Sequence, residues 1–598
     1  MLGSRLLRLA VVVALLASLA HAHNPGEPFA HPGTQPATFQ EGLAPPGDCD
    51  DCHGQVDRSD QGAIAPFDAW RGSMMANAAR DPLFLAALTV ANQDVPNSGS
   101  FCLRCHAPVG WLNGRSLPGS GSGLTPDDQE GVTCAFCHRL KPGREEQPPG
   151  PLIGNGSAWL DDSATYTGVR LDGGAPHPVK ADPYLRSAEL CGVCHSVSNP
   201  ALPMRAADGT EIAPRLPEQR TYEEWAASAF AAEDRTCVDC HMPRRPGRAA
   251  LDDQAPVRPD LAVHTFAGGN ALGPLLMDAA YPGEAPEAYA AAHAASREML
   301  GQAAAVRVRF VGAPIEGRAR VVVEVENRTG HKLPTGYPDG RRMWLEATAK
   351  VDDAAPHWQS PAHDAVTDTL PPDVLRTWQA RLGAVGRGHH FHLLQYDTVL
   401  EDTRIPPRGL RATPELAPRG RDYGPQPDGT LRHWDTFEFE VPVPQDAGAR
   451  LQVEVNLRWQ SLTRDYVDFL VAENRTDDRG VRLAAAVDAA GGLAPLELTR
   501  ARATLRLDAA VVAEVCDGVD DDLDGRVDEG SPAVECGVGE CRVESPTCDA
   551  GQAIVCVAGR PERELCNALD DDCDGQTDEA LPGRVCGFGV CRREAAAC

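Results

Sequence analysis

One short pattern limits what this chain can fold into more than any other feature: Cys-x-x-Cys-His occurs five times within the first 241 residues. The copies are Cys49, Cys52 and His53; Cys102, Cys105 and His106; Cys134, Cys137 and His138; Cys191, Cys194 and His195; and Cys237, Cys240 and His241. On a helical turn, residues three and four positions apart share a face, so both thiols and the imidazole can point the same way. Two such thiols can add to the two vinyl groups of a haem while the histidine reaches the iron. We therefore expect five covalently bound haem c groups, each with its motif histidine as the proximal ligand.

Three other interpretations of the pattern explain less. A zinc site needs four ligands, five half-sites do not pair evenly, and zinc gives no reason for a histidine after every second cysteine. A disulfide oxidoreductase usually has one Cys-x-x-Cys within a thioredoxin-like βαβ pattern, which is not visible in this sequence. Local structural disulfides would likewise leave the five histidines unexplained.

Each haem iron also has a sixth position, and the group that fills it separates electron transfer from catalysis. His264, in "HTFAGGN", and His331, in "TGHKLPTGYP", stand in segments whose Gly and Pro content would hold the backbone rigidly. The further candidates for distal ligands are His177, His293, Met74 and Met75. Each has an ordinary alternative, because a turn histidine can bond to the backbone and a methionine more often packs within a helix.

Residues 1–22 have the features of a signal peptide. Arg5 and Arg8 precede an apolar run, and Ala20-His21-Ala22 fits a small-x-small cleavage site. An uncleaved membrane anchor is the alternative, but the run is shorter than the roughly 20 residues that span a bilayer. No later segment is apolar enough to cross a membrane, so we expect no transmembrane segment after signal cleavage. The mature chain is expected in the periplasm or at the outer surface of a bacterium, where cysteines are normally paired or otherwise occupied.

The cysteines divide the chain into three regions. Ten lie between Cys49 and Cys240, ten lie between Cys516 and Cys598, and none lies in the 275 residues between them. The first region, residues 23–305, is expected to form a pentahaem cytochrome c domain with short helical pieces at 67–92 and 286–305. It has too few aliphatic runs for an ordinary core of its size, so we expect the haems to fill its middle.

The second region, residues 306–510, alternates apolar and polar side chains in several short runs, among them 307–310, 321–326, 436–441 and 451–459. Alternation with a period of two predicts strands. Short strands bounded by Gly, Pro, Asn or Asp are typical of an antiparallel sandwich. The sequence therefore predicts a multidomain protein: a haem-filled, loop-rich α-helical cytochrome domain, then an antiparallel β-sandwich-like domain, then a small disulfide-rich repeat tail.

The tail, residues 514–598, contains two Cys- and Asp-rich repeats with a period of 50 residues. The matching acidic positions are Asp520, Asp522, Asp524 and Asp528 in the first repeat and Asp570, Asp572, Asp574 and Asp578 in the second. Asp at positions 1, 3 and 5 with Gly at 6 is the first half of an EF-hand calcium loop, although the Glu at position 12 is missing. Carboxylates without His or free thiolate favour calcium over copper, and a solvated acidic turn is the alternative. The ten cysteines are most simply five disulfides that stabilise a domain too small for its own core.

The charge of the chain limits its partners. The formal net charge is −29, and it becomes −31 when Arg5 and Arg8 leave with the signal peptide. Such a surface repels nucleic acid and anionic lipid, so we expect no nucleic-acid partner. It favours cationic partners or bound cations, and an acidic surface is also an ordinary route to solubility.

Several stretches together resemble a known group of proteins. "FDAWRGSMMANAARDPLF", followed by "FCLRCHAPVG", "GVTCAFCHRL", "CGVCHSV" and "CVDCHMP", is similar to the multihaem cytochromes related to cytochrome c-554 and, more distantly, to hydroxylamine oxidoreductase. The resemblance covers about residues 40–270, and "TGHKLPTGYPDGRR" looks like a recurring companion of these haem domains. It implies closely packed haems that conduct electrons, with mostly histidine pairs on the irons. The tail resembles the cysteine-rich metal-binding repeats of some bacterial surface proteins, which implies association with the cell surface.

Two departures from the cytochrome group bear on the sites. Met74 and Met75 stand where relatives often have a histidine, and no Cys-x-x-Cys-Lys occurs, so the lysine-ligated haem typical of pentahaem nitrite reductases is absent. Some members of the group leave one haem open to small nitrogen or sulfur compounds. We therefore expect an exported pentahaem cytochrome that transfers electrons between redox partner proteins. The alternative is a haem oxidoreductase with one open iron that acts on nitrite, hydroxylamine or tetrathionate.

Overall fold

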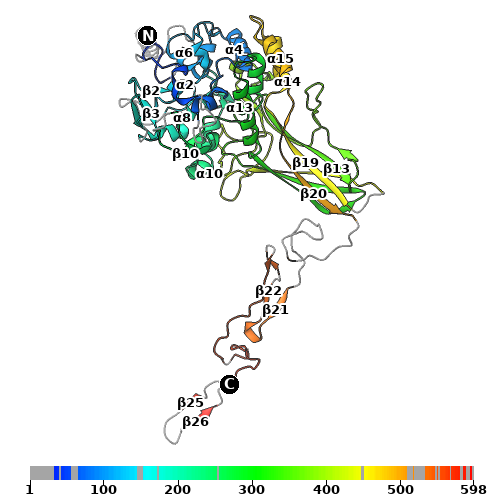
Figure 1. Cartoon of the computed structure of the whole chain (residues 1–598). Helices are drawn as coiled ribbons and strands as arrows, with labels where there is room; N and C mark the ends of the chain where they lie inside the picture. The colour runs from blue at the N-terminus through cyan, green and yellow to red at the C-terminus, as the bar shows by residue number, and fades with distance from the viewer. Residues whose placement is uncertain are drawn as a thin grey trace, which may run out of the picture.

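The fold of the chain is known from a computed structural model (Figure 1). The described residues are 32–39, 42–54, 65–143, 152–171, 174–251, 255–445, 450–507, 516, 533–545, 548–549, 552–565, 567–579, 584–586 and 593–595. The expected signal peptide lies outside this set, as do the first-repeat residues Asp520, Asp522, Asp524 and Asp528. No helix within the described ranges is long and apolar enough to cross a membrane.

The first region is built from short helices and two-stranded pairings joined by loops. The helices are α2 (Gly47–His53), α3 (Pro66–Arg71), α4 (Pro82–Asp94), α5 (Gly99–His106), α6 (Pro108–Leu112), α7 (Cys134–Cys137), α8 (Ala188–Gly192), α9 (Thr221–Ala226), α10 (Ala229–Ala232), α11 (Cys237–His241), α12 (Gly273–Ala280) and α13 (Pro286–Leu300). The strands are β1 (Leu140–Lys141), β2 (Trp159–Leu160), β3 (Tyr166–Gly168), β4 (Val179–Ala181), β5 (Val197–Ser198), β6 (Met204–Arg205), β7 (Glu211–Ala213), β8 (Pro217–Gln219), β9 (Arg244–Gly247) and β10 (Arg258–Ala262). The pairs are β1–β2, β3–β4, β5–β8, β6–β7 and β9–β10.

The helix expected over residues 67–92 is interrupted, because α3 ends at Arg71 and α4 begins only at Pro82. In the interruption, the Asn77 side-chain amide donates to the Arg71 carbonyl at 3.0 Å and to the Ser73 carbonyl at 2.8 Å, in competition with helical hydrogen bonds. A proline disfavours helical backbone in the residue before it but suits the first helical position, so Pro82 restarts the helix. The helix expected over 286–305 ends at Leu300, and the next residues enter a strand.

The second region consists of two antiparallel sheets and a pair of helices. The strands are β11 (Ala304–Ile315), β12 (Arg318–Asn327), β13 (Arg342–Val351), β14 (Trp358–Gln359), β15 (Thr377–Ala384), β16 (Gly388–His389), β17 (Thr398–Asp402), β18 (Trp434–Pro442), β19 (Arg450–Gln460) and β20 (Leu496–Arg506). One sheet has the order β11-β12-β18, and the other has the order β16-β15-β13-β19-β20, with β14 and β17 beside it. The helices α14 (Arg464–Glu473) and α15 (Arg479–Ala489) lie between β19 and β20 in the chain.

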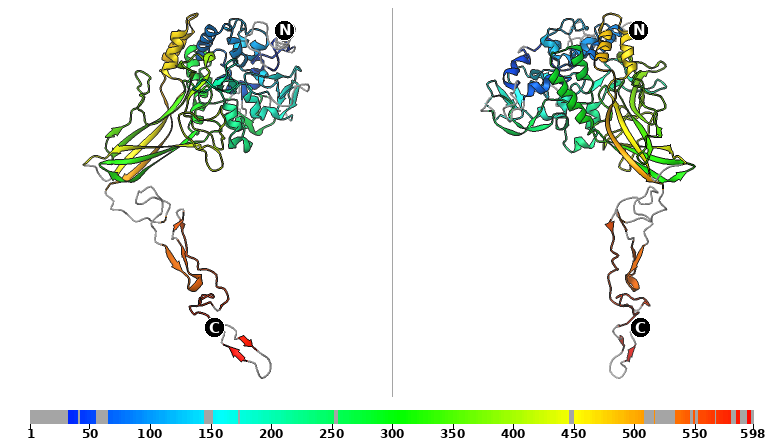
Figure 2. Two further views of the ribbon diagram at one scale, coloured as in Figure 1. Left: turned by 180° about the vertical axis from the view of Figure 1, so that it is seen from behind. Right: turned by 45° about the vertical axis from the view of Figure 1, so that its right-hand side comes forward.

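The two sheets share one hydrophobic core. Val321 and Val323 on β12 are fully buried in the same cluster as Leu345 on β13 and Val455 on β19. The intervening residues of these strands face outward, so the alternation in the sequence is an alternation of burial. Figure 1 shows the helices gathered at one end and the long strands extending away from them, and Figure 2 shows the same arrangement from two further directions.

The cores of the two regions differ in size. The cluster between the sheets contains 29 buried residues, whereas the clusters around the motif cysteines contain eight and four. In the larger of these two, Cys137 and Cys194 pack against Phe136, Leu160 and Val193. Cys102 packs against the smaller one. The first region is therefore poor in aliphatic core where its motif cysteines lie.

The tail is a series of short hairpins joined by disulfides. Its strands are β21 (Val534–Cys536), β22 (Val543–Ser545), β23 (Cys548–Asp549), β24 (Gln552–Ala553), β25 (Arg584–Cys586) and β26 (Arg593–Ala595). The hairpin β25–β26 repeats β21–β22 at positions 50 residues later. Three disulfides are described, Cys516–Cys548, Cys536–Cys556 and Cys541–Cys573. The last of them joins the two repeats, which explains why Cys573 has no counterpart at the matching position in the first repeat, where Leu523 stands.

Candidate functional site

Each Cys-x-x-Cys-His motif begins on a short helix, and local hydrogen bonds fix where two of these helices start. Thr133, just before Cys134, accepts a hydrogen bond on its hydroxyl from the Phe136 amide at 3.2 Å. Thr236, just before Cys237, forms a capping box with Asp239. Such caps satisfy the free amides of the first helical turn. They hold the first cysteine of each of these motifs at the start of a helical turn.

None of the ten motif cysteines forms a disulfide in the described part of the chain. Cys52 and Cys240 are exposed, and the other eight are partly buried. Burial raises the pKa of Cys102 and of Cys137 to about 12, so these two are neutral thiols. Six tail cysteines, in contrast, form three disulfides, so within the described residues the disulfides lie in the tail and the motif cysteines stay unpaired.

Four of the five motif histidines are oriented by backbone carbonyls. The Nδ1 atoms of His53, His106, His138 and His241 lie 2.7, 3.0, 2.7 and 2.6 Å from the carbonyl oxygens of Ala249, Ala78, Thr167 and Ala267. A carbonyl only accepts, so Nδ1 carries the proton and Nε2 keeps its lone pair for a metal. The fifth, His195, has its Nδ1 atom 3.2 Å from Nε2 of Gln219.

Four of the motif histidines are also held in the neutral form. Burial lowers the pKa of His106 and of His195 to about 4, and burial also lowers the pKa of His138 and of His241. A histidine must be neutral to bind a metal ion. These rings are therefore prepared to act as ligands through Nε2.

Two motif histidines face a second imidazole from a distant part of the chain. The ring of His264 lies opposite the ring of His138, with centroids 6.3 Å apart and planes at 17°. The ring of His331 lies opposite the ring of His241, with centroids 6.4 Å apart and planes at 29°. These separations are too large for direct ring stacking, so an atom or a group can lie between the rings of each pair.

The separations match those of two histidines bound to one metal ion. A metal–imidazole bond is about 2.0 Å and the ring centroid lies about 1.1 Å beyond Nε2, so two ligating rings have centroids about 6.2 Å apart. His264 has its Nδ1 atom 3.0 Å from the Ala262 carbonyl, and His331 has its own 3.1 Å from the Lys332 carbonyl. Burial lowers the pKa of both to about 4. Both rings are thus neutral, with Nε2 available.

The other candidate distal ligands lie in different surroundings. His293, on α13, has its Nδ1 atom 2.7 Å from the Ala271 carbonyl. His177 is exposed and contacts the Tyr166 ring edge-on, with centroids 5.2 Å apart. Met74 packs beside Met277 and Tyr289, and the Met75 carbonyl accepts a hydrogen bond from the Val132 amide.

One loop orients three of these histidines, a feature that sequence reasoning missed. Within residues 262–271, the carbonyls of Ala262, Ala267 and Ala271 face the Nδ1 atoms of His264, His241 and His293 respectively. The Gly-rich stretch "HTFAGGN" marked the loop as rigid, but a carbonyl has no sequence signature. The loop therefore brings together three candidate ligands: His241 from α11, His293 from α13 and His264 from the loop itself.

The five motifs lie next to one another. The Cys134 thiol interacts with the Cys49 thiol and lowers the pKa of Cys49, which joins the first and third motifs. Corresponding thiol contacts lower the pKa of Cys105 through Cys194 and that of Cys237 through Cys191. The contact between Cys105 and Cys194 joins the second motif to the fourth, and the contact between Cys237 and Cys191 joins the fifth motif to the fourth. Cys137 and Cys194 pack against the same hydrophobic cluster, which joins the third motif to the fourth.

In the tail, three of the expected acidic residues converge. Asp570, Asp572 and Asp574 each have a carboxylate oxygen within 4.8 Å of the others, and Asp572 also forms such a group with Glu564 and Glu579. Asp578 instead accepts hydrogen bonds from the amides of Asn567 and Ala568, at 2.9 and 3.1 Å. Glu564 and Glu579 were not predicted, because the EF-hand template has no acidic residue at their positions.

Comparisons with known proteins add little to these sites. No family model matches the chain, and no curated protein matches it. Its structure is similar to the crystal structure of a penta-heme cytochrome c552 from Thermochromatium tepidum, with 17% sequence identity and a TM-score of 0.44 over 78% of this chain and 99% of that chain. Because this similarity is low, the function proposed below is based on the residues of this chain.

Proposed function

We propose that this protein is an exported pentahaem c-type cytochrome that transfers electrons between redox partner proteins. The observation that carries the proposal is the pairing of His138 with His264 and of His241 with His331 at the separation expected for two axial ligands. Each of these four rings has Nδ1 beside a carbonyl oxygen, which leaves the lone pair of Nε2 for a metal. The donor atoms present therefore fit a haem iron between the rings of each pair.

The motif cysteines and histidines would hold the five haems. Each pair of thiols supplies the two covalent attachments, and the neighbouring histidine supplies the proximal ligand. His264 and His331 would supply distal ligands at the third and fifth sites, and His293, His177, Met74 and Met75 are candidates for the others. When bound, haem iron supplies one-electron chemistry by cycling between its ferric and ferrous states.

Electron transfer is supported by the adjacency of the motifs. Thiol contacts and a shared hydrophobic cluster link the first motif to the third, the third to the fourth, and the fourth to the second and the fifth. A carrier needs such continuity, because an electron must pass from one iron to the next. Cys52 and Cys240 are exposed, so one attachment point of the first site and one of the fifth lie at the protein surface, where a partner protein could approach.

The tail is proposed to bind calcium. Asp570, Asp572 and Asp574 supply hard oxygen ligands, and Glu564 and Glu579 extend the group. A disulfide links this repeat to the preceding one, so calcium would stiffen a segment that already depends on cross-links. Such a segment suits association with the cell surface, and export through the expected signal peptide is part of the same proposal.

The experiment that tests the proposal is a haem count combined with an electron count. Pyridine haemochrome absorbance and intact mass of the purified protein are expected to give five covalent haems. Coulometric reduction is expected to take up five electrons per chain. A protein with the Cys134→Ala and Cys137→Ala changes is expected to contain four covalent haems and to take up four electrons. Five haems in the variant would contradict the assignment of that motif, and fewer than five in the wild type would contradict the proposal.

A further inference from the structure

His331 must be held in place across two regions of the chain. It lies in the loop between β12 and β13, whereas His241, which it faces, belongs to α11 in the first region. Within the loop, Asn327 donates from its side-chain amide to the His331 carbonyl at 2.8 Å. That contact fixes the loop to itself but not to α11, so something else must set the separation of the two imidazoles.

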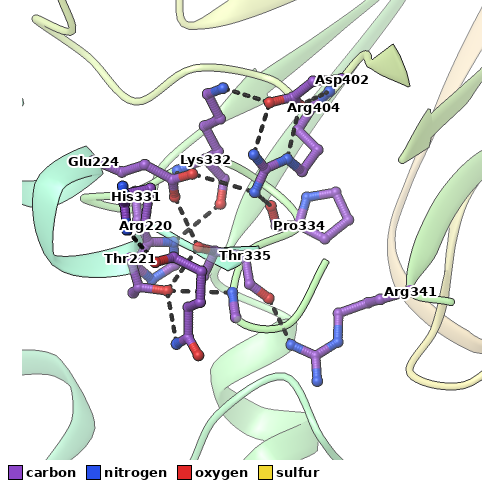
Figure 3. Close-up of polar contacts among 12 residues, drawn as sticks. Arg220, Thr221, Glu224, His331, Lys332, Pro334, Thr335, Arg341, Asp402 and Arg404 are labelled. Atoms are coloured by element: carbon purple, nitrogen blue, oxygen red, sulfur yellow. Dashed lines mark hydrogen bonds and ion pairs between the residues drawn. The ribbon is translucent and has the colours of Figure 1, made fainter. Parts of the chain in front are cut away.

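Glu224, in α9, binds the His331 loop at two points. Its Oε2 atom accepts a hydrogen bond from the Lys332 amide at 3.0 Å and another from the Thr335 hydroxyl at 2.8 Å (Figure 3). Lys332 also contacts the His331 ring, because the Lys332 carbonyl oxygen lies 3.1 Å from His331 Nδ1. The Thr329 hydroxyl lies at the same distance, 3.1 Å, from this nitrogen, so Glu224 holds the residue that supplies one of the two oxygens orienting the His331 ring.

The same segment is tied to the motif that carries His241. Trp225, the residue after Glu224, donates from Nε1 to the Arg235 carbonyl at 2.8 Å. Arg235 lies two residues before Cys237, the first cysteine of the fifth motif. Glu224 is thus connected on one side to the His331 loop and on the other to the start of α11.

Buried charges make Glu224 difficult to replace. Its Oε1 atom lies 3.2 Å from the Arg404 guanidinium, Arg404 binds Asp402 through two nitrogens at 2.7 Å each, and Lys332 Nζ lies 2.6 Å from Asp402 (Figure 3). Glu224 and Lys332 are fully buried. Two cations and two anions therefore balance, and loss of the Glu224 charge leaves a buried excess of positive charge beside the His331 loop.

We propose that Glu224 is a positioning residue for the axial ligand His331, and that its carboxylate sets the distance between the His331 and His241 imidazoles. This inference rests on the proposed function, since it requires an iron between these rings. Glu224 does not touch the iron itself. It acts through the Lys332 peptide and the Thr335 hydroxyl, and it keeps the loop from drawing back from α11.

The test is cyanide binding to the oxidised full-length protein. Cyanide binds an iron whose distal ligand is displaced, so its affinity reports how firmly His331 is held. Loss of a partner that orients a metal ligand typically weakens the ligand's hold about 10- to 100-fold. Glu224→Gln is therefore expected to raise the cyanide affinity of one iron by about the same factor, with five haems retained. His331→Ala is the reference, in which that iron is fully open.

Two further variants make the test specific. Thr335→Val removes one of the two hydrogen bonds that Glu224 accepts from the His331 loop, but it leaves the Glu224 charge in place. It is therefore expected to raise cyanide affinity by a smaller factor than Glu224→Gln does. Glu415→Gln is the matched control, because Glu415 pairs with Arg220 at 2.9 Å just before α9 but forms no hydrogen bond or ion pair with residues 329–336 in the described part of the chain. It is expected to leave the cyanide affinity unchanged. Thr335→Val still tests the inference if Glu224→Gln fails to fold.

The outcomes separate this inference from the proposed function. If His331→Ala opens one iron while Glu224→Gln and Thr335→Val bind cyanide as the wild type does, Glu224 has no positioning role, although His331 is still a ligand. If His331→Ala does not change cyanide binding, His331 is not a ligand and both ideas fail. A rise in cyanide affinity in Glu224→Gln and Thr335→Val, but not in Glu415→Gln, supports the inference.

Discussion

Replacing Asp402 by Asn tests the account of the buried charges. Asp402 is nearly inaccessible, and its carboxylate accepts hydrogen bonds from Lys332 Nζ at 2.6 Å and from two nitrogens of Arg404 at 2.7 Å. Asn has the same shape without the charge, so both cations then share the single charge of Glu224. Removal of one partner from a buried ion pair costs about 3 to 5 kcal/mol. We expect Asp402→Asn to lower the free energy of unfolding by this amount.

The assay is guanidinium denaturation followed by far-ultraviolet circular dichroism. The control is Glu440→Gln, because Glu440 pairs with Arg318 at 3.8 Å between side chains that are 51% and 59% exposed. An exposed pair of this kind contributes about 0 to 1 kcal/mol, so the control is expected to match the wild type. If Asp402→Asn unfolds within about 1 kcal/mol of the wild type, the buried network does not stabilise the fold as we argue.

The carboxylate of Asp402 also makes the free energy of unfolding depend on pH. Burial raises the pKa of Asp402, but Arg404 and Lys332 lower it more, to about 2 from the ordinary 3.8. A folded-state pKa below the unfolded value means that the stabilisation is complete above pH 3.8 and is lost as the pH falls through 2. The shift corresponds to about 2 kcal/mol. The difference in stability between wild type and Asp402→Asn is therefore expected to shrink over this range, and a constant difference would contradict the assignment.

Two further predictions concern the metal sites. His264→Ala is expected to convert one of the five irons to a form that binds cyanide or imidazole, with the haem count unchanged, and an unaltered spectrum would exclude His264 as a ligand. Asp572→Asn, which alters the residue shared by both acidic groups of the tail, is expected to weaken calcium binding at least about tenfold in isothermal titration calorimetry of the full chain. Glu544→Gln, on exposed β22, is the control for the tail and is expected to bind calcium normally. Equal calcium affinity in both variants would show that the acidic groups are not the site.

Strands in the second region could be predicted because their pattern is local. The run 451–459 alternates residue by residue, and β19 covers it, with Leu451, Val453, Val455 and Leu457 fully buried. A helix is also a local pattern, but the interruption of 67–92 depends on where the Asn77 amide finds its partners. The Asn77 amide competes with backbone amides for the carbonyls of Arg71 and Ser73, and composition does not reveal which donor binds them.

The site was predictable in its residue types but not in its pairings. The motifs identified the thiols and the histidines that we propose as proximal ligands, and Gly-rich and Pro-rich surroundings singled out His264 and His331 as candidate distal ligands. Which motif histidine each one faces depends on the packing of segments far apart in the chain, and so does the role of the Ala262, Ala267 and Ala271 carbonyls. Glu224 had no sequence signature, since an acidic residue in "TYEEWA" is ordinarily on the surface of a helix.

The most direct test of the central claim is the electron paramagnetic resonance spectrum of the fully oxidised protein, recorded on a sample whose haem content has been counted. The account of an electron carrier predicts five low-spin irons, each with two protein ligands, and His138–His264 and His241–His331 among the pairs. A stoichiometric high-spin signal that shifts when nitrite or hydroxylamine is added would contradict it. That result would show one open iron and would favour the oxidoreductase alternative.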